Sequence, residues 1–176
     1  MTIAFISHAD CAMHETTSYH PDTAERLAAI HDRLIASGLE MIMHFYDAPM
    51  VSVEQLCRVH DADYVSEIFQ KLQDNERVWL DADTLMVSAS LTAAQRGAGA
   101  VVKAVDLVMS QDANSAFCCV RPPGHHAEHN KAMGFCIFNN VAVGVAHAIA
   151  QYGLERVAII DFDAHHGNGT EDIFRG

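Results

Sequence analysis

The sequence predicts an α/β domain in which a parallel β-sheet is flanked by helices on both faces. Short apolar runs alternate with helical patterns along the chain, and this spacing is typical of right-handed strand–helix–strand units. Half of the 176 residues are hydrophobic, which is enough for a single domain with a buried core. Polar clusters follow directly after two of the apolar runs, where parallel sheets place their binding sites.

The first half of the chain is expected to contain two strands and three helices. The apolar run Thr2–Ile6 predicts the first strand. The segment Asp22–Glu25 resembles a capping box, and it predicts a helix with an apolar stripe from Leu27 to Leu34. Gly38 is expected to end that helix. The other expected elements are a strand at Glu40–Phe45 and helices at Ser52–Val59 and Asp63–Leu72.

The second half is expected to continue the alternation. Ser90–Met109 predicts a long helix rich in alanine and valine, and Ala116–Val120 predicts the next strand. Asn139–Tyr152 is apolar enough for a buried helix, which Gly153 would end. The β-branched run Val157–Phe162 then predicts a further strand.

Two carboxylates and a histidine lie at alternating positions around the end of that last run. Side chains of an extended strand alternate between its faces, so Asp161, Asp163 and His165 are expected to point the same way. Carboxylate oxygen and imidazole nitrogen together suit zinc or a similar divalent ion. The alternative from this stretch alone is a hydrogen-bonded, chemically inert loop.

A second polar cluster follows the run Ala116–Val120. The Pro-Pro-Gly sequence at residues 122–124 forces a turn, so the adjacent His125 and His126 are expected on a loop at a strand end. Imidazole is the natural proton carrier near neutral pH. The alternative for a single pair of histidines is an ordinary solvated surface.

Composition narrows the function classes. The formal charge of −12 argues against nucleic acid as the main ligand and is compatible with cationic substrates. We expect no membrane span, because no apolar stretch is long enough. The N-terminus has no basic region ahead of its apolar run, so a cytoplasmic location is expected. The five cysteines are odd in number and lack CxxC spacing, which favours reduced thiols over disulfides.

Taken together, the motifs resemble the arginase-like deacetylase superfamily, which includes histone deacetylases and acetylpolyamine amidohydrolases. The clearest matches are Arg121–His126, Gly134–Asn140 and Asp161–Gly169, and weaker ones are His20–Leu27, Val59–Val65 and Asp81–Thr84. The sequence Arg-Pro-Pro-Gly-His-His, together with Asn168, is similar to the class II branch. The resemblance implies the three-layer α/β/α fold of arginases and deacetylases.

The same resemblance implies a metal centre. Asp163 and His165 would be ligands of Zn²⁺ or another divalent ion, with one position left open for water and substrate. A structural K⁺ ion would be held by Asp161, Asp163 and the carbonyl of His165. Its remaining ligands have no counterpart in this sequence.

His125 and His126 would be the proton-transfer pair of the site. By resemblance, Asp161 would hold His125 and favour its charged form, and Asn168 would hold His126 without adding charge. Which histidine is the base and which is the acid stays open.

Substrate contacts are also implied by the resemblance. Gly134, Phe135 and Cys136 would line the substrate channel, and Arg26 would lie in an internal channel through which acetate leaves. His147, inside an apolar helix, is expected to be a packed core residue. Five further residues are open as members of the site rim or as loop caps: His60, Asp61, Asp83, Glu128 and His129.

The function that follows is a metal-dependent deacetylase that hydrolyses the acetamide of acetyl-lysine in a protein or of a small acetylated amine. One alternative is an acetylpolyamine amidohydrolase, and another is an arginase-type ureohydrolase with two manganese ions. A third alternative, of a different class, is a non-catalytic fragment or partner-binding protein.

Members of the family are longer than this chain of 176 residues. Their third metal ligand, an aspartate, and their transition-state tyrosine come from later strands, and neither has a matching position here. Residues 1–176 are therefore expected to be the N-terminal portion of one deacetylase domain, partnered by its C-terminal half or by a second copy of the chain.

Overall fold

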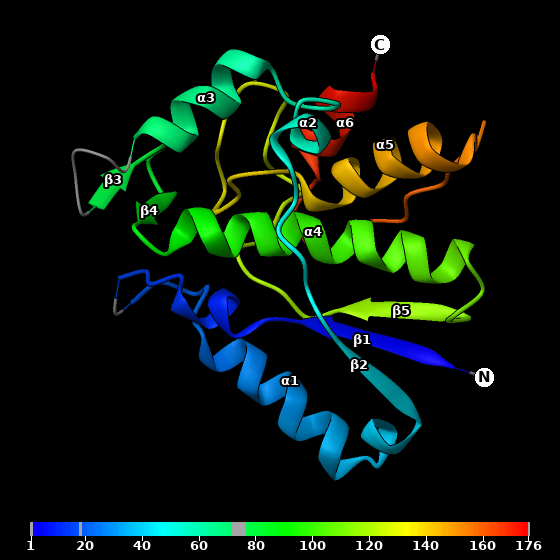
Figure 1. Cartoon of the computed structure of the whole chain (residues 1–176). Helices are drawn as coiled ribbons and strands as arrows, with labels where there is room; N and C mark the ends of the chain where they lie inside the picture. The colour runs from blue at the N-terminus through cyan, green and yellow to red at the C-terminus, as the bar shows by residue number, and fades with distance from the viewer. Residues whose placement is uncertain (1, 18, 72–76, 176) are drawn as a thin grey trace.

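A three-stranded parallel sheet forms the centre of the fold. The computed structural model describes residues 2–17, 19–71 and 77–175, and its strands follow the order β2-β1-β5 (Figure 1). β1 (Ile3–Ser7) lies between β2 (Met43–Asp47) and β5 (Ser115–Cys118). Ile3 is aligned with both Met43 and Ser115, so all three strands end at the same edge of the sheet.

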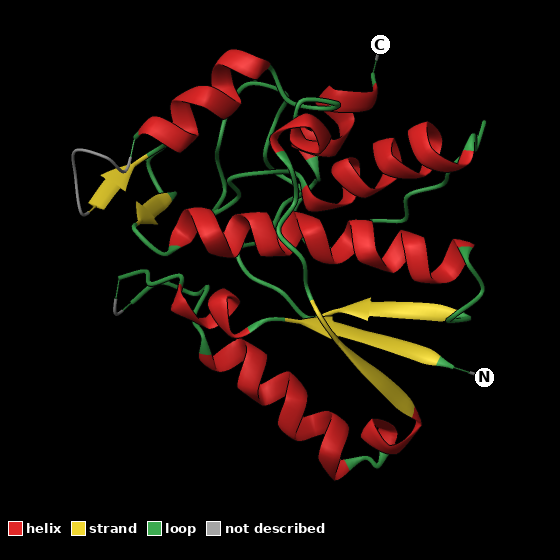
Figure 2. Cartoon of the chain, viewed as in Figure 1, coloured by secondary structure: helices red, strands yellow, loops and turns green. Residues whose placement is uncertain are grey.

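The side chains of β1 alternate between two helical layers. Ile6 is fully buried in an apolar cluster with residues of α4 (Ser90–Met109). Phe5 points to the opposite face, where its ring centroid lies 6.3 Å from that of His31 on α1 (Glu25–Ala36). Helices therefore cover both faces of the sheet, as the sequence predicts (Figure 2).

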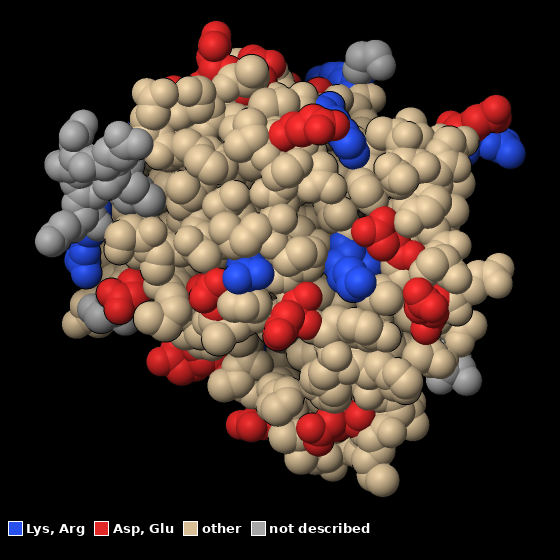
Figure 3. All heavy atoms as spheres, viewed as in Figure 1, with Lys and Arg blue, Asp and Glu red and all other residues tan. Residues whose placement is uncertain are grey.

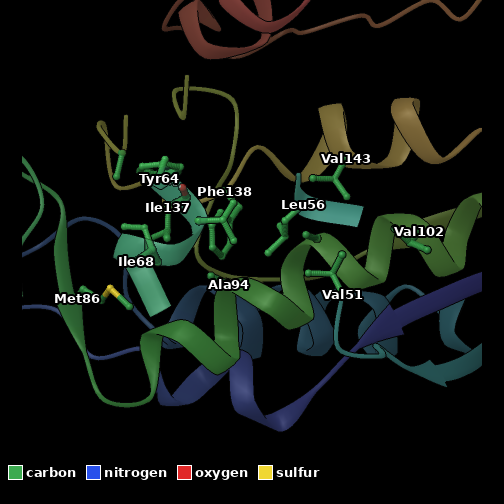
Figure 4. Packing of buried hydrophobic residues seen from close by; sticks show 13 residues of the cluster. Val51, Leu56, Tyr64, Ile68, Met86, Ala94, Val102, Ile137, Phe138 and Val143 are labelled. Atoms are coloured by element: carbon green, nitrogen blue, oxygen red, sulfur yellow. Dashed lines mark hydrogen bonds between the residues drawn. The ribbon is translucent and has the colours of Figure 1, made fainter. Parts of the chain in front are cut away.

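A second helical layer packs on the far side of α4. α5 (Asn140–Tyr152) crosses α4 at Gly144, where an added Cβ would lie 2.3 Å from the side chain of Val101. The largest apolar cluster lies here, between α4, α5 and α3 (Ala62–Gln70), and includes Phe138 (Figure 4). This layer supports the loops that follow β5.

The remaining elements are short and connect these layers. They are η1 (Ala9–Met13), η2 (Leu39–Ile42), α2 (Val53–Leu56), β3 (Arg77–Trp79), β4 (Leu85–Val87) and α6 (Asn168–Phe174). β3 and β4 form an antiparallel hairpin in which Val78 pairs with Met86. The sequence pattern does not predict this hairpin, because each strand is only three residues long.

The prediction of a strand at Val157–Phe162 is wrong. This segment joins no sheet among the described residues, and Ile160 and Phe162 are 85% and 96% exposed. A hollow of about 410 Å³, lined in part by Cys118 and Ile160, lies between the segment and the edge strand β5. A β-branched run favours extended backbone, but a strand forms only where a neighbouring backbone lies within hydrogen-bonding distance.

Element boundaries differ from the predictions at several points. Asp22 does not cap α1, whose N-cap position is Ala24 and has no side-chain cap. β2 begins at Met43 because the residues before it form the 3₁₀ helix η2. Gly38 and Gly153 end their helices in the left-handed conformation, as predicted. The expected end of the third helix, Leu72, lies outside the described residues.

Gly99 on α4 allows the chain at Pro49 to pass directly against the helix. An added Cβ would lie 1.9 Å from the carbonyl oxygen of Pro49, a backbone atom that cannot move aside alone. We expect Gly99→Ala to lower the free energy of unfolding by about 1–3 kcal/mol, measured by urea denaturation. In the matched control Gly97→Ala, the new Cβ would meet only the Asn140 side chain at 3.2 Å, and helix propensity offsets the crowding to within about 1 kcal/mol. Equal losses in the two variants would contradict this explanation.

Charge is spread in small groups over the face shown in Figure 3, where several acidic side chains lie beside a Lys or Arg. The sequence has 23 acidic and 11 basic residues. None of the helices in the described part of the chain combines the length and apolar character needed to cross a membrane.

Candidate active site

A pocket of about 320 Å³ lies beyond the carboxyl end of β5 and gathers most of the predicted site residues. Its lining includes His125, His126, Gly134, Phe135, Asp163, His165 and Arg26. A larger hollow of about 580 Å³ lies between α5, α6 and residues 155–161, but it contains neither histidine of the pair. We therefore assign the candidate site to the smaller pocket.

The two neighbouring histidines are held from behind by different partners. His125 Nδ1 lies 2.9 Å from Asp161 Oδ2, and His126 Nδ1 lies 2.6 Å from Asn168 Oδ1. The ring centroids are 4.0 Å apart. Because each ring is held through Nδ1, its other nitrogen, Nε2, is the one left for a ligand in the pocket. Both contacts are those that the family resemblance implies.

Asp161 is a hydrogen-bond acceptor at neutral pH. Its hydrogen bond with His125 lowers the pKa of the carboxyl, and the backbone N–H of Asp163, 3.1 Å from Asp161 Oδ1, lowers it further. An ionised carboxylate only accepts hydrogen bonds, so Nδ1 of His125 is the donor. Asp161 does not line the pocket with Asp163 and His165, which differs from the expectation that all three point the same way.

Asp163 and His165 supply an oxygen and a nitrogen at one wall of the pocket. Asp163 Oδ1 accepts the backbone N–H of His165 at 2.8 Å, which lowers the pKa of the carboxyl. The His165 ring nitrogen Nδ1 lies 3.4 Å from the same oxygen. This donor pair suits zinc. Across residues 2–17, 19–71 and 77–175, however, no three His, Cys, Asp or Glu side chains are grouped closely enough to hold a metal, so the pair fits two ligand positions of such a site.

The Gly134–Phe135 turn is held in place from the β3–β4 side. Both residues have positive φ angles, 55° and 69°, a conformation that is strained for phenylalanine. The Gly134 N–H donates to Asp83 Oδ1 at 3.2 Å, and the Phe135 N–H donates to Thr84 Oγ1 at 3.0 Å. The His20 ring packs edge-on against Phe135 with centroids 4.2 Å apart. Thr84 and His20 belong to the weaker motifs, but no spacing in the sequence links them to Phe135.

Cys136 does not line the pocket, in contrast to the prediction. The residue is completely buried, and its Sγ lies 3.3 Å from the Gly134 carbonyl oxygen. Burial raises the pKa of the thiol to about 12. Cys136 therefore packs behind the turn as an apolar side chain.

A buried ion pair adjoins the pocket, whose lining includes Asp22. Arg121 is 1% exposed, and it donates to Asp22 Oδ1 and to the Asp22 carbonyl, both at 2.9 Å. Arg26 donates to the same Oδ1 at 2.8 Å, but its side chain is 54% exposed. Asp22 Oδ2 is buried without a hydrogen-bond partner among the described residues. The sequence places Arg121 in a motif without identifying Asp22 as its partner.

His60 and His147 are structural residues that do not belong to the pocket. His60 is 3% exposed, its Nδ1 lies 2.9 Å from the Glu128 carbonyl oxygen, and its Nε2 accepts the Asn139 N–H at 3.0 Å. His147 is 6% exposed, as expected for a core residue, and lies 2.7 Å from Asp106 Oδ1. Neither histidine contacts the pocket.

Burial of His60 should make stability depend on pH. It lowers the pKa of the ring from the ordinary 6.5 to about 4. Between these two pH values His60 is therefore protonated in the unfolded chain but stays neutral in the folded chain. His60 should therefore contribute a decrease in the free energy of unfolding as the pH falls from 6.5 to 4, which reaches about 3 kcal/mol at the lower end. Free energies of unfolding measured by urea denaturation should depend less steeply on pH in His60→Gln than in wild type. In the exposed control His44→Gln, the dependence on pH should be the same as in wild type. Parallel curves for wild type and His60→Gln would contradict the assignment.

The fold and the pocket together define an arginase/deacetylase-like α/β protein. The sequence profile of the histone deacetylase domain matches residues 20–176. The chain is 42% identical over 154 residues to a histone deacetylase-like amidohydrolase of Pseudomonas aeruginosa, covering 88% of this chain and 40% of that protein. It is 38% identical over 156 residues to the mouse polyamine deacetylase HDAC10, covering 85% of this chain and 23% of that protein.

A solved structure agrees with this relationship. The crystal structure of the HDA15 HD domain matches with a TM-score of 0.92 and 31% identity, covering 98% of this chain and 49% of that one. The chain belongs to the histone deacetylase domain family. It spans about half the length, or less, of each of these three proteins.

Proposed function

We propose that this chain provides the histidine pair and two metal ligands of a zinc-dependent deacetylase. The observation that carries the proposal is the pocket in which His125 and His126 lie 4.0 Å apart, each held through Nδ1, with Asp163 and His165 in the same lining. The third ligand and a transition-state tyrosine would come from outside the described residues.

The proposed reaction is hydrolysis of an acetamide to acetate and an amine. Zinc held by Asp163, His165 and a further ligand would supply Lewis-acid polarisation of the carbonyl and acidify water. Nε2 of one histidine would take a proton from the attacking water, and the other histidine would give a proton to the amine as its C–N bond breaks. Asp161 would stabilise the charged form of His125, and Asn168 would hold His126 without adding charge.

The substrate would be acetyl-lysine in a protein or a small acetylated amine. Phe135, backed by the His20 ring, offers a flat apolar wall for a methylene chain. The formal charge of −12 favours cationic substrates, which include acetylated polyamines. The mouse relative is named a polyamine deacetylase and the Pseudomonas relative a histone deacetylase-like amidohydrolase, so both substrate types should be tested.

Turnover of a fluorogenic acetyl-lysine amide and of an acetylated polyamine would test the proposal. The chain would be measured alone and as a chimera in which the later half of the Pseudomonas relative follows residue 176. We expect zinc-dependent, hydroxamate-sensitive turnover by the chimera and none by the chain alone. Asp163→Ala in the chimera should abolish both zinc binding and turnover.

Other outcomes distinguish the alternatives. Hydroxamate-sensitive turnover by the chain alone would mean that a third ligand comes from the chain itself or from a second copy. A folded, zinc-loaded chimera that hydrolyses neither substrate would contradict the deacetylase proposal and favour a non-catalytic role.

A further inference from the structure

Glu128 lies directly behind the amide that holds His126. Asn168 Nδ2 donates to Glu128 Oε1 at 3.0 Å, while the other end of the same amide, Oδ1, lies 2.6 Å from His126 Nδ1. Glu128, Asn168 and His126 are therefore connected in series by hydrogen bonds. The series begins at Glu128 in the loop after the histidine pair, passes through Asn168 at the start of α6, and ends at His126 in the pocket. The sequence leaves Glu128 open as a rim residue or a loop cap, and the proposed mechanism gives it no role.

An asparagine amide has a donor end and an acceptor end, and its environment decides which faces which neighbour. A carboxylate accepts hydrogen bonds, so Glu128 selects the Nδ2 end. The second neighbour of Nδ2, Met133 Sδ at 3.4 Å, is also an acceptor. Asn168 Oδ1 is thereby directed at His126, whose Nδ1 must carry the proton in this hydrogen bond.

The carboxylate of Glu128 is positioned by a well-anchored loop. The Glu128 N–H donates to the Lys131 carbonyl at 2.9 Å, and the Glu128 carbonyl oxygen lies 2.9 Å from His60 Nδ1. The next residue, His129, is tied to α6 because its backbone N–H donates to Asp172 Oδ2 at 3.0 Å. Glu128 and Asn168 are therefore held on two segments that are themselves connected.

We propose that Glu128 is a positioning residue that fixes the Asn168 amide and, through it, the Nδ1–H tautomer of neutral His126. In this tautomer the Nε2 lone pair faces the pocket and can accept a proton. With the amide reversed, Asn168 Nδ2 would donate to Nδ1, the ring proton would move to Nε2, and the ring could no longer act as a base through that atom. The catalytic value of this tautomer rests on the proposed function, but the tautomer itself does not.

Long-range ¹H–¹⁵N correlation spectra of the histidine rings would test the proposal on the 176-residue chain without measuring activity. At about pH 8, above the ordinary pKa of histidine, wild type should show the Nδ1–H tautomer of His126. Its signals would be identified by their loss in His126→Phe. We expect Glu128→Ala to populate the Nε2–H tautomer substantially, on the order of half of the molecules, and Glu128→Gln to retain Nδ1–H because its amide oxygen still accepts.

Two controls separate tautomer selection from a general loss of structure. His125 should keep its tautomer in every variant, because Asp161 holds it independently, and the exposed Glu54→Ala should change neither ring. Asn168→Asp provides a rescue, since a carboxylate cannot be reversed: Glu128→Ala combined with Asn168→Asp should restore Nδ1–H on His126.

Three results would overturn the proposal: an Nε2–H tautomer in wild type, an unchanged His126 in folded Glu128→Ala, or no rescue in the double variant. If the spectra behave as expected and the chimera never turns over substrate, the deacetylase proposal fails while the role of Glu128 stands.

Discussion

Replacing Asp22 with alanine should lower the free energy of unfolding by about 3–5 kcal/mol. Asp22 and Arg121 are 3% and 1% exposed, and the substitution would leave the guanidinium buried without its carboxylate. A loss of this size is a large fraction of the stability of an ordinary domain. Urea denaturation followed by circular dichroism would measure it.

The matched control is Arg26→Ala, which removes the other basic partner of the same carboxylate oxygen. Because the Arg26 side chain is 54% exposed, its loss should cost only about 0–1 kcal/mol. The loss of stability in Asp22→Asn should lie between the losses in Asp22→Ala and Arg26→Ala, since the amide oxygen can still accept a hydrogen bond from Arg121. Similar small losses for Asp22→Ala and Arg26→Ala would show that the buried pair is not a main source of stability.

Replacing His126 with alanine should lower deacetylation by the chimera about 10²–10⁴-fold. The proposed role of this ring is proton transfer through Nε2, with Nδ1 held by Asn168 at 2.6 Å. Turnover at saturating substrate should fall with little change in KM, because the ring would act on the transition state more than on the bound substrate.

His44→Ala is the control for the loss of a histidine as such. His44 is an exposed residue of β2 and does not line the pocket, so turnover should stay within about twofold of wild type. The denaturation midpoint of each variant would show whether it is folded. A folded His126→Ala variant with nearly full turnover would remove His126 from the proton-transfer pair.

Local signals in the sequence determined most of the helices and the layer order. α4 spans Ser90–Met109, the predicted range, because twenty residues of consistent helical pattern outweigh any single position. Gly38 and Gly153 end their helices because a left-handed residue is easiest for glycine. The alternation of strands with these helices predicted the parallel sheet.

The family resemblance of the motifs also predicted which side chains meet at the candidate site. His125 contacts Asp161 and His126 contacts Asn168, although the partners are 36 and 42 residues apart. These contacts came from a family resemblance, since no periodicity in one sequence can show pairing at such distances. The roles assigned to these residues remain proposals.

Only the tertiary structure decided the features that depend on a distant neighbour. Val157–Phe162 has the composition of a strand but lies across a hollow from β5, so it has no ladder partner among the described residues. Asp22 has the spacing of a helix cap, but the buried guanidinium of Arg121, 99 residues away, takes its carboxylate instead. A buried charge gains more from an ion partner than a helix end gains from a cap.

Dependence on distant neighbours also explains why some residues around the pocket were wrongly placed or not identified from the sequence. The resemblance implied that Cys136 lines the substrate channel, but its side chain is completely buried. Thr84 holds the Phe135 backbone from 51 residues away. Glu128 reaches His126 only through Asn168. The sequence by itself determined the long helices, the parallel sheet and most of the motif residues that surround the pocket, because local pattern and motif specify them. Burial, ion partners and the direction of each hydrogen bond depend on segments brought together by folding, and only the tertiary structure decided these.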